Sequence, residues 1–414
     1  MISLDPLHNQ EALDFWQSKV RLSPGQFAKL LDDEKTMAFS ISGIAKSDML
    51  ETVFNAISSA IENGDTFAEF KGNIQSVIDA RGWTGKAAWR IETIYRTNIQ
   101  TAFNVGRYRQ MMRVTNSRPF WMYSAVNDSR TRPTHRAMNG KIFRFDHPFW
   151  DKWYPPNGFR CRCSVRTLSQ REIDRDGLTV ETQDPTGGLV EPTTPEGIVM
   201  PARLLMPDPG FAHNPGKSAY AGVADDATGP VIWKDVPNLK GPDAFRRKKM
   251  ENVRPADIPD LDSSMLLPGG ETDDFYKAEF LSRYGQEKVI TDAAGEPVIL
   301  SLRACMADKA AGTWKFNKSG HGQMIPLMEG MIEEPFEIWL VPQRTENGRI
   351  RLTRRYICLW KTAAKNRVGG MAVYEVSGGV WQGVTSFLPM KKGKVDTNLN
   401  YVEKQRHGIL LWGK

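Results

Sequence analysis

The chain has 414 residues, more than one ordinary hydrophobic core accommodates, so two or three domains are expected. Hydrophobic residues make up 40% and charged residues 25%, which is typical of a folded globular protein and argues against a disordered one. A formal net charge of +7 is a modest basic bias. It suits contact with nucleic acid or with acidic protein surfaces and establishes neither.

The sequence shows no sign of membrane insertion or secretion. No segment approaches the roughly 20 continuous apolar residues that a membrane span requires. The start of the chain, residues 1–6, lacks a basic region followed by an apolar stretch, so no secretory signal is expected. The four cysteines do not form a disulfide framework, which favours a reducing compartment. They are Cys161, Cys163, Cys305 and Cys358.

Residues 47 to about 112 are predicted to be helical, after an N-terminal arm at residues 1–46. Apolar residues recur at spacings of three and four after Ser47, which can cap the first helix. Asn63-Gly64 ends that helix, Arg81-Gly82 ends a second one, and a third begins after Thr84.

The third predicted helix is rich in arginine. We interpret these side chains as one face, which is either a solvated surface or a contact for DNA or for an acidic partner subunit. The four arginines are Arg90, Arg96, Arg107 and Arg109.

The rest of the chain predicts an α+β multidomain protein. Residues 116–168 gather aromatic, proline and cysteine residues and predict a compact module of loops and short strands that completes a domain at 47–170. Residues 171–270 hold 13 of the 25 prolines and predict an extended connector with short ordered pieces. Residues 271–414 alternate strand-like runs with turn signals such as Asn347-Gly348, which predicts helices followed by an antiparallel sheet.

The most specific residues lie between 127 and 163. One segment runs from Asn127 to His135 and includes Asp128, Arg130 and Arg132; Asn139-Gly140 follows; a second segment, Pro155 to Cys163, ends in Cys-Arg-Cys. Together they resemble the Mu F-like minor head protein family, over roughly residues 50–170. The resemblance implies a structural motif of Asp128, Arg130, Arg132, His135 and Gly140, and a protein that is needed for head morphogenesis and carried near the portal.

The same region offers nitrogen and sulfur ligands of the kind that zinc prefers. The candidate structural zinc ligands are His135, His147, Cys161 and Cys163. The alternative is that the two thiols are small buried hydrophobic groups and that His135 is a structural residue held by Asp128. The Cys-x-Cys spacing is shorter than that of most structural zinc sites, so both interpretations stay open.

The end of the chain, residues 271–414, is similar to phage-encoded members of the barnase–EndoU–colicin–RelE superfamily of small ribonucleases. The resemblance is carried by Pro335-Phe336-Glu337-Ile338-Trp339, Arg354-Arg355-Tyr356-Ile357, Val384-Thr385-Ser386-Phe387 and the terminal run from Arg406 to Trp412.

RNA cleavage needs a base for the 2′-hydroxyl, a cation for the phosphorane and an acid for the leaving oxygen, and it needs no metal. His321 in a glycine-flanked loop suits acid/base work, and the predicted catalytic set is His321, Arg355, Lys361 and Thr385. A basic strand surface is expected to hold the phosphates of a nucleic acid. Its arginines are Arg344, Arg349, Arg351 and Arg354. Alternatively, His321 is a surface loop residue and the arginines protect a sheet edge from aggregation.

The sequence therefore predicts a minor capsid protein of a Mu-like phage or prophage with a ribonuclease-like domain. Its expected partners are the portal, scaffold and major capsid proteins, with RNA or packaged DNA as further candidates and no membrane. It is expected in the virion, and in the host cytoplasm during assembly. The alternative is a virion-delivered endoribonuclease that uses the head module for packaging.

Overall fold

The structure is a computed structural model that describes residues 9–193, 197–221, 234–235, 243, 247–308, 313–318, 320–362, 365–377, 380–387 and 399–414. The chain divides into two compact units, Met1–Val223 with Glu346–Arg349, and Ala224–Thr345 with Ile350–Lys414. Each unit combines helices with sheets, which confirms the predicted α+β class. Among the described residues, no helix is long and apolar enough to cross a membrane.

The first unit contains the predicted helices, in a slightly different division. Helix α3 (Ser47–Asn63) ends at Gly64, whose φ of 75° is left-handed, as the sequence predicts. The second predicted helix is broken at Ile74 into α4 (Phe67–Asn73) and α5 (Gln75–Arg81). After the 3-10 turn η2 (Gly85–Ala87), α6 (Trp89–Arg113) follows.

Residues 10–46 pack against these helices. Their elements are α1 (Gln10–Gln17), β1 (Val20–Arg21), α2 (Pro24–Phe27), η1 (Glu34–Met37) and β2 (Ala38–Phe39). The Trp16 indole is fully buried, stacks on Phe54 of α3 at 4.9 Å and donates a hydrogen bond to its carbonyl oxygen. The segment predicted as an arm is therefore part of the helical core.

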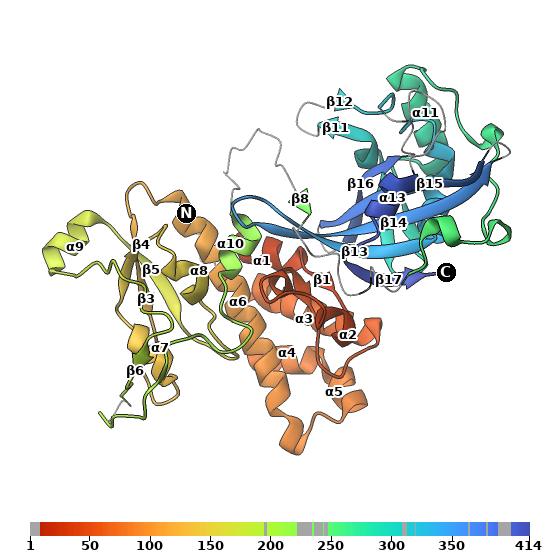
Figure 1. The fold of residues 1–414 in the computed structure, drawn as a ribbon. Coiled ribbons are helices and arrows are strands. Elements are labelled where there is room, and N and C mark those ends of the chain that lie inside the picture. Colours follow the sequence, from red (N-terminus) through yellow and green to blue (C-terminus); the bar gives the residue numbers. More distant parts are fainter. Residues whose placement is uncertain are drawn as a thin grey trace, which may run out of the picture. The chain divides into compact units, whose positions relative to one another are not determined.

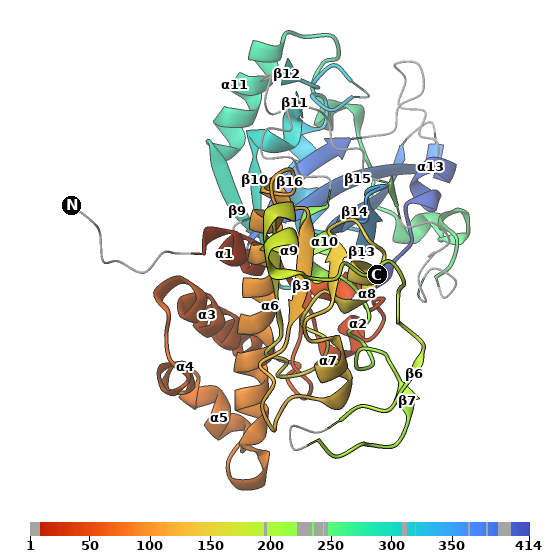
Figure 2. The same cartoon turned by 90° about the vertical axis from the view of Figure 1, so that its left-hand side faces the viewer.

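A three-stranded antiparallel sheet completes the first unit. Its order is β4 (Ile142–Arg144), β3 (Phe120–Ser124), β5 (Ser164–Leu168), with the short helices α7 (Pro133–Met138) and α8 (Phe149–Trp153) in the connections. Helix α6 runs between this sheet and the helices α3 to α5 (Figures 1 and 2). The module has an aromatic core in which every ring is at most 2% exposed: Trp121, Tyr123, Phe143, Phe149, Trp150, Trp153 and Tyr154.

The predicted connector is folded where it is described. Its first part packs within the first unit and its last part within the second unit. Beyond α9 (Gln170–Asp176) and the hairpin of β6 (Leu189–Val190) and β7 (Arg203–Leu204), α10 (Pro215–Tyr220) contacts α6. In the second unit, Met250 of η4 (Met250–Asn252) is fully buried. The boundaries at 46, 170 and 270 remain predictions, and much of 222–246 lies outside the described residues.

The second unit is built around one large sheet. The strand order is β17-β13-β14-β15-β16-β10-β9, with β8 (Lys234–Asp235) also on β13. The strands are β9 (Glu287–Thr291), β10 (Pro297–Ser301), β13 (Glu337–Arg344), β14 (Ile350–Thr362), β15 (Lys365–Ser377), β16 (Val380–Phe387) and β17 (Ile409–Gly413). Asn347-Gly348 joins β13 to β14 as the sequence predicts, with φ of 91° at Gly348. All strand pairs of this sheet are antiparallel except β10 with β16.

Helices cover both faces of this sheet. Successive residues of a strand point to opposite faces, so one strand contributes side chains to both layers. On β14, Ile357 and Leu359 join a core that includes Val402 of α13 (Leu399–Lys404). The intervening Cys358 thiol donates to the carbonyl oxygen of Met331 in α12 (Met328–Glu333). The remaining elements are α11 (Asp273–Tyr284), β11 (Met306–Asp308), β12 (Thr313–Trp314), η5 (Pro255–Asp257), η6 (Ser263–Met265), η7 (Leu302–Cys305) and η8 (Ile325–Leu327).

Candidate functional site

The two halves of the 127–163 motif meet in the first unit through an ion pair. Arg162 places both terminal nitrogens on Asp128, at 2.8 Å and 2.5 Å. The Arg130 backbone N–H donates to the same carboxylate at 3.0 Å. Hydrogen bonding from Arg162 is the main reason why the pKa of Asp128 lies well below its usual range. Asp128 therefore stays ionised and holds the Cys-Arg-Cys segment to the loop after β3.

The other motif residues also have structural contacts. The Arg132 guanidinium pairs with Asp208 at 3.0 Å and donates to the Phe159 carbonyl oxygen. Arg130 is largely exposed and lies 3.7 Å from Asp128. Gly140 has φ of 82°, a left-handed conformation that suits glycine, and its N–H donates to the Tyr123 carbonyl oxygen.

His135 faces the two cysteines of the Cys-Arg-Cys segment. Its Nδ1 lies 3.7 Å from the Cys161 sulfur and 3.6 Å from the Cys163 sulfur, and the three ligand atoms lie within 4.8 Å of one another. A hydrogen bond with the Cys163 thiol, helped by His135, holds the pKa of Cys161 well below its ordinary value. The pKa of Cys163 is raised by the same thiol pair and by burial. One proton therefore leaves this pair much more readily than the second.

His147, the fourth predicted ligand, lies outside this group. Its Nδ1 accepts a hydrogen bond from the Phe149 backbone N–H at 3.1 Å, and its Nε2 is 3.3 Å from the Thr182 carbonyl oxygen. The side chain is a turn residue at the start of α8. Asp128 also does not hold His135, since the described contacts of Asp128 run to Arg162, Arg130 and Thr131.

Several residues that the sequence did not single out position this segment. Gln100 and Asn104 of α6 both donate to the Cys163 carbonyl oxygen, at 3.1 Å and 3.3 Å. Asn157 is fully buried and accepts a hydrogen bond from the Tyr123 hydroxyl at 2.9 Å. Only Asn104 offered a signal in the sequence, because it is a polar residue at a position that α6 buries.

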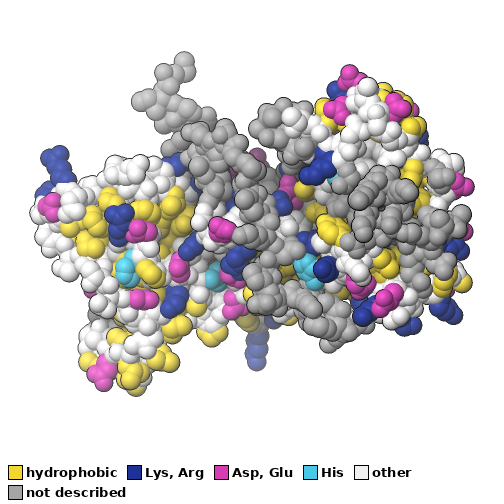
Figure 3. All heavy atoms as spheres, turned by 45° about the horizontal axis from the view of Figure 1, so that its top comes forward, with side chains coloured by type: hydrophobic (Ala, Val, Ile, Leu, Met, Phe, Trp, Pro, Cys, Tyr) yellow, Lys and Arg dark blue, Asp and Glu magenta, His cyan; other side chains and the backbone are white. Residues whose placement is uncertain are grey.

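The four arginines of α6 do not form one face. At about 100° per residue, only Arg96 and Arg107 point in similar directions. Arg96 pairs with Glu92, Arg90 donates to the Ser42 carbonyl oxygen, and Arg109 lies over the Tyr220 ring at 5.0 Å. On the surface drawn in Figure 3, basic and acidic side chains of the described residues are interspersed.

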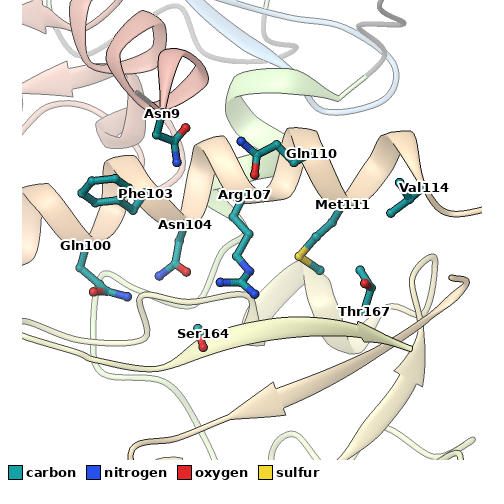
Figure 4. A pocket seen from close by; sticks show the side chains of 10 residues that line it. All are labelled: Asn9, Gln100, Phe103, Asn104, Arg107, Gln110, Met111, Val114, Ser164 and Thr167. Atoms are coloured by element: carbon teal, nitrogen blue, oxygen red, sulfur yellow. The ribbon is translucent and has the colours of Figure 1, made fainter. Parts of the chain in front are cut away.

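Arg107 lines a hollow between α6 and β5 of about 480 Å³. Its side chain extends from α6 toward Ser164 of β5, beside Asn104 and Gln100 (Figure 4). The hollow is open and lined by both polar and apolar side chains, and a single arginine there does not make the extended basic surface that DNA binding requires.

In the second unit, Arg354 is inside the domain rather than on an exposed basic strand. Its guanidinium pairs with buried Asp292 at 2.5 Å and lies over the Trp381 ring at 4.5 Å. The Tyr356 hydroxyl donates to the same carboxylate at 2.6 Å. The acid that neutralises Arg354 comes from the turn between β9 and β10, far away in sequence. The neighbouring Arg351 similarly pairs with Glu375 of β15.

Arg355 points to the opposite face and belongs to a row of residues that crosses the sheet. Arg355 is opposite Val373 of β15, and Val373 is opposite Thr385 of β16. Residues opposite one another share a face, and strands lie about 4.8 Å apart, so Arg355 and Thr385 lie roughly 10 Å from each other. Each of these two side chains contacts a histidine. Arg355 Nη1 is 2.9 Å from His407 Nε2, and the Thr385 hydroxyl is 3.0 Å from His321 Nε2.

His321 is buried rather than exposed in a surface loop. Burial lowers its pKa to about 4. Its Nδ1 contacts the Lys318 carbonyl oxygen, so this nitrogen carries the proton and Nε2 accepts the hydrogen bond of Thr385. His321 is therefore neutral at pH 7 and is placed to orient Thr385, whose hydroxyl proton is committed to it.

The remaining predicted residues lie away from this row. Lys361 is six residues beyond Arg355 on β14, roughly 20 Å along the strand, and pairs with Asp260 at 3.6 Å. Arg344 and Arg349 are half-buried at the β13–β14 hairpin, a similar distance in the other direction. Half-buried His407, for which no role was predicted, lies closer to Arg355 than any of them.

Comparisons with known proteins match both units. Residues 51–166 match the family described as Phage Mu protein F like protein. Residues 274–413 match the family described as phage-Barnase-EndoU-ColicinE5/D-RelE like nuclease2. The chain carries a Mu F-like domain and a phage nuclease-like domain. Both resemblances expected from the sequence motifs are confirmed.

Two relatives share the Mu F-like part. The "Putative capsid assembly protein F" of Escherichia phage Mu is 32% identical over 240 residues, which is 51% of this chain and 55% of the relative. The "Mu-like prophage FluMu F protein" of Haemophilus influenzae is 37% identical over 166 residues, 37% of this chain and 40% of the relative. The chain thus spans about half the length of the first relative and less of the second. No solved structure gives a significant match.

Proposed function

We propose that the protein is a head-morphogenesis component of a Mu-like phage or prophage, needed for procapsid assembly and carried in the virion near the portal. One observation carries the proposal. The two motif segments that define the Mu F-like resemblance contact each other through Asp128 with Arg162 and through His135 with the two cysteines. A relative of this domain is named as a capsid assembly protein.

The partners proposed for this domain are the portal, scaffold and major capsid proteins, met in the host cytoplasm during assembly. The motif itself supports the shape of the domain rather than reaction chemistry, because its charged groups pair with one another. We therefore assign assembly to the whole first unit and no enzymatic step to it.

Particle composition tests this proposal. Phage particles produced by the source phage should be purified, and the chain should be quantified against the portal and major capsid proteins by mass spectrometry. The expected result is a chain present in few copies per head and cross-linked to the portal. Heads that assemble normally and contain none of it would contradict the proposal.

A second candidate function, RNA cleavage by the nuclease-like domain, is favoured by the row on the sheet. Arg355 is buried and donates hydrogen bonds to Gln405 and His407, so a phosphate can use its positive charge only after these contacts open. His407 is then the base that takes the 2′-hydroxyl proton. The 2′-oxygen attacks phosphorus as its proton passes to His407, the bond from phosphorus to the 5′-oxygen breaks, and that oxygen takes a proton from solvent water. The products are a 2′,3′-cyclic phosphate and a free 5′-hydroxyl. His321 acts through Thr385 and is a positioning residue.

Total RNA incubated with the full chain tests this activity. Cleavage is expected from the wild type and should fall at least about 100-fold in Arg355→Ala and in His407→Ala. The matched control is Lys361→Ala on the same strand, which should cleave at the wild-type rate. Intact RNA with every protein, or equal cleavage by all of them, would remove this function.

A further inference from the structure

The group formed by His135, Cys161 and Cys163 has the composition and burial of a metal site. The three side chains are 2%, 3% and 4% exposed. Two sulfurs and an imidazole nitrogen are ligands that bind zinc tightly in a protein interior. The cysteines are two residues apart directly before β5, and both sulfurs face the same ring.

The distances fit one tetrahedral ion. With zinc–sulfur bonds of about 2.3 Å and zinc–nitrogen bonds of about 2.0–2.1 Å, a tetrahedral angle places sulfur and nitrogen about 3.5–3.6 Å apart. The observed separations from His135 Nδ1 are 3.7 Å to Cys161 and 3.6 Å to Cys163. All three ligand atoms lie within 4.8 Å of one another, close enough to share a single ion.

Among the described residues, the His135 imidazole has no strong hydrogen-bond partner. Its Nδ1 faces only sulfur atoms, which are weak hydrogen-bond partners. Its Nε2 is buried and has no hydrogen-bond partner among the described residues. A metal–nitrogen bond at Nδ1 would replace these weak contacts, while Nε2 would carry the ring proton.

We propose that His135, Cys161 and Cys163 bind one Zn²⁺ ion, which joins α7 to the Cys-Arg-Cys segment. The fourth ligand is a water molecule or the hydroxyl of Tyr123, which lies beside Cys163. His147 takes no part. The site is structural, since its side chains are buried and the segment that it fixes is also held by Asp128 and α6.

The test is metal analysis of the full chain purified under reducing conditions with added zinc. About one zinc per chain is expected, and it should fall by roughly tenfold or more in Cys161→Ala, Cys163→Ala and His135→Ala. Cys358→Ala, a buried thiol of the second unit, and His147→Ala are matched controls that should keep the ion. Tyr123→Phe separates the two fourth ligands, because only a bound hydroxyl would make this variant lose affinity.

A second measurement uses the unaltered protein, so a variant that fails to fold does not leave the question open. Cobalt added to the metal-free wild type should give the strong d–d bands of a tetrahedral site and a thiolate-to-cobalt charge-transfer band. Zinc should abolish both signals. A wild type that binds neither metal, or a cobalt spectrum identical in Cys161→Ala, would overturn the proposal.

Discussion

Arg354 and Arg254 both pair with a carboxylate in the second unit, but only one pair is shielded from water. The Arg354 and Asp292 side chains are 4% and 0% exposed, whereas those of Arg254 and Asp257 are 82% and 47% exposed. Removing one member of a buried pair leaves an uncompensated charge, while exposed pairs contribute little.

Arg354→Ala should therefore lower the free energy of unfolding of the second unit by about 3–5 kcal/mol. Arg254→Ala should leave it unchanged. Denaturant unfolding of the full chain, followed by a probe in the second unit, measures both. Equal effects of the two substitutions would show that Arg354 is not buried in this ion pair.

The lowered pKa of His321 predicts how stability depends on pH. The unfolded chain protonates this histidine near its ordinary pKa of 6.5, whereas the folded protein does so only at about 4. The unfolded state thus binds more protons between these values, and stability falls as the pH drops from 6.5 toward 4. His321→Asn should show a shallower decline in its unfolding midpoint over this window. Parallel curves for the two proteins would contradict the burial of His321.

Sequence reasoning found the residues that carry a recognisable pattern and missed those that only the fold brings together. Asp128, His135 and the cysteines lie in a motif; Asp128 contacts Arg162, which stands between the two cysteines, and His135 faces both thiols. Asp292, the partner of Arg354, is 62 residues away in sequence. No local pattern connects them. The local sequence around these arginines therefore predicted a basic surface, whereas the folded chain supplies carboxylates from β15 and from the turn between β9 and β10.

At the scale of elements, close helix packing depends on one glycine. A Cβ on Gly106 of α6 would lie 2.9 Å from the Ala12 backbone nitrogen of α1. Gly72 in the last turn of α4 has nothing within 4 Å of that position. Alanine normally stabilises a helix relative to glycine by up to about 1 kcal/mol.

Gly106→Ala should therefore lower the melting temperature, because α1 must move away from α6. Gly72→Ala should leave it unchanged or raise it slightly. Thermal unfolding by circular dichroism compares them, and a stabilised Gly106→Ala protein would show that α1 does not pack here.

Helix ends were predictable because glycine at Gly64 and Gly82 marks them directly. The break at Ile74 was not, since the apolar spacing continues through it. In the sheet, hairpin neighbours followed from turn residues such as Asn347-Gly348. The parallel pairing of β10 with β16 could not be predicted, because about 80 residues separate the strands and turn chemistry does not specify such a contact.

At the scale of the whole molecule, the two proposed functions depend on residues of different domains, so they can be tested separately. The proposed role in head assembly would depend on Asp128 and Arg162 in the Mu F-like domain, and the proposed RNA cleavage on Arg355 and His407 in the nuclease-like domain. The +7 net charge alone does not separate these two proposals. They are argued from different contacts, the motif contacts in one unit and the row across the sheet in the other.

Head production by a Mu-like phage or prophage that encodes this chain tests the proposed assembly role most directly. Its own copy of the gene should be replaced by the wild type, by Asp128→Arg, which places like charges at the Arg162 contact, or by Arg355→Ala. Heads are then counted by electron microscopy of lysates. We predict normal heads with the wild type and Arg355→Ala and a clear loss with Asp128→Arg, because the new cation repels Arg162 at the contact that joins the two motif segments. Normal head numbers with Asp128→Arg, or their loss with Arg355→Ala alone, would contradict the account.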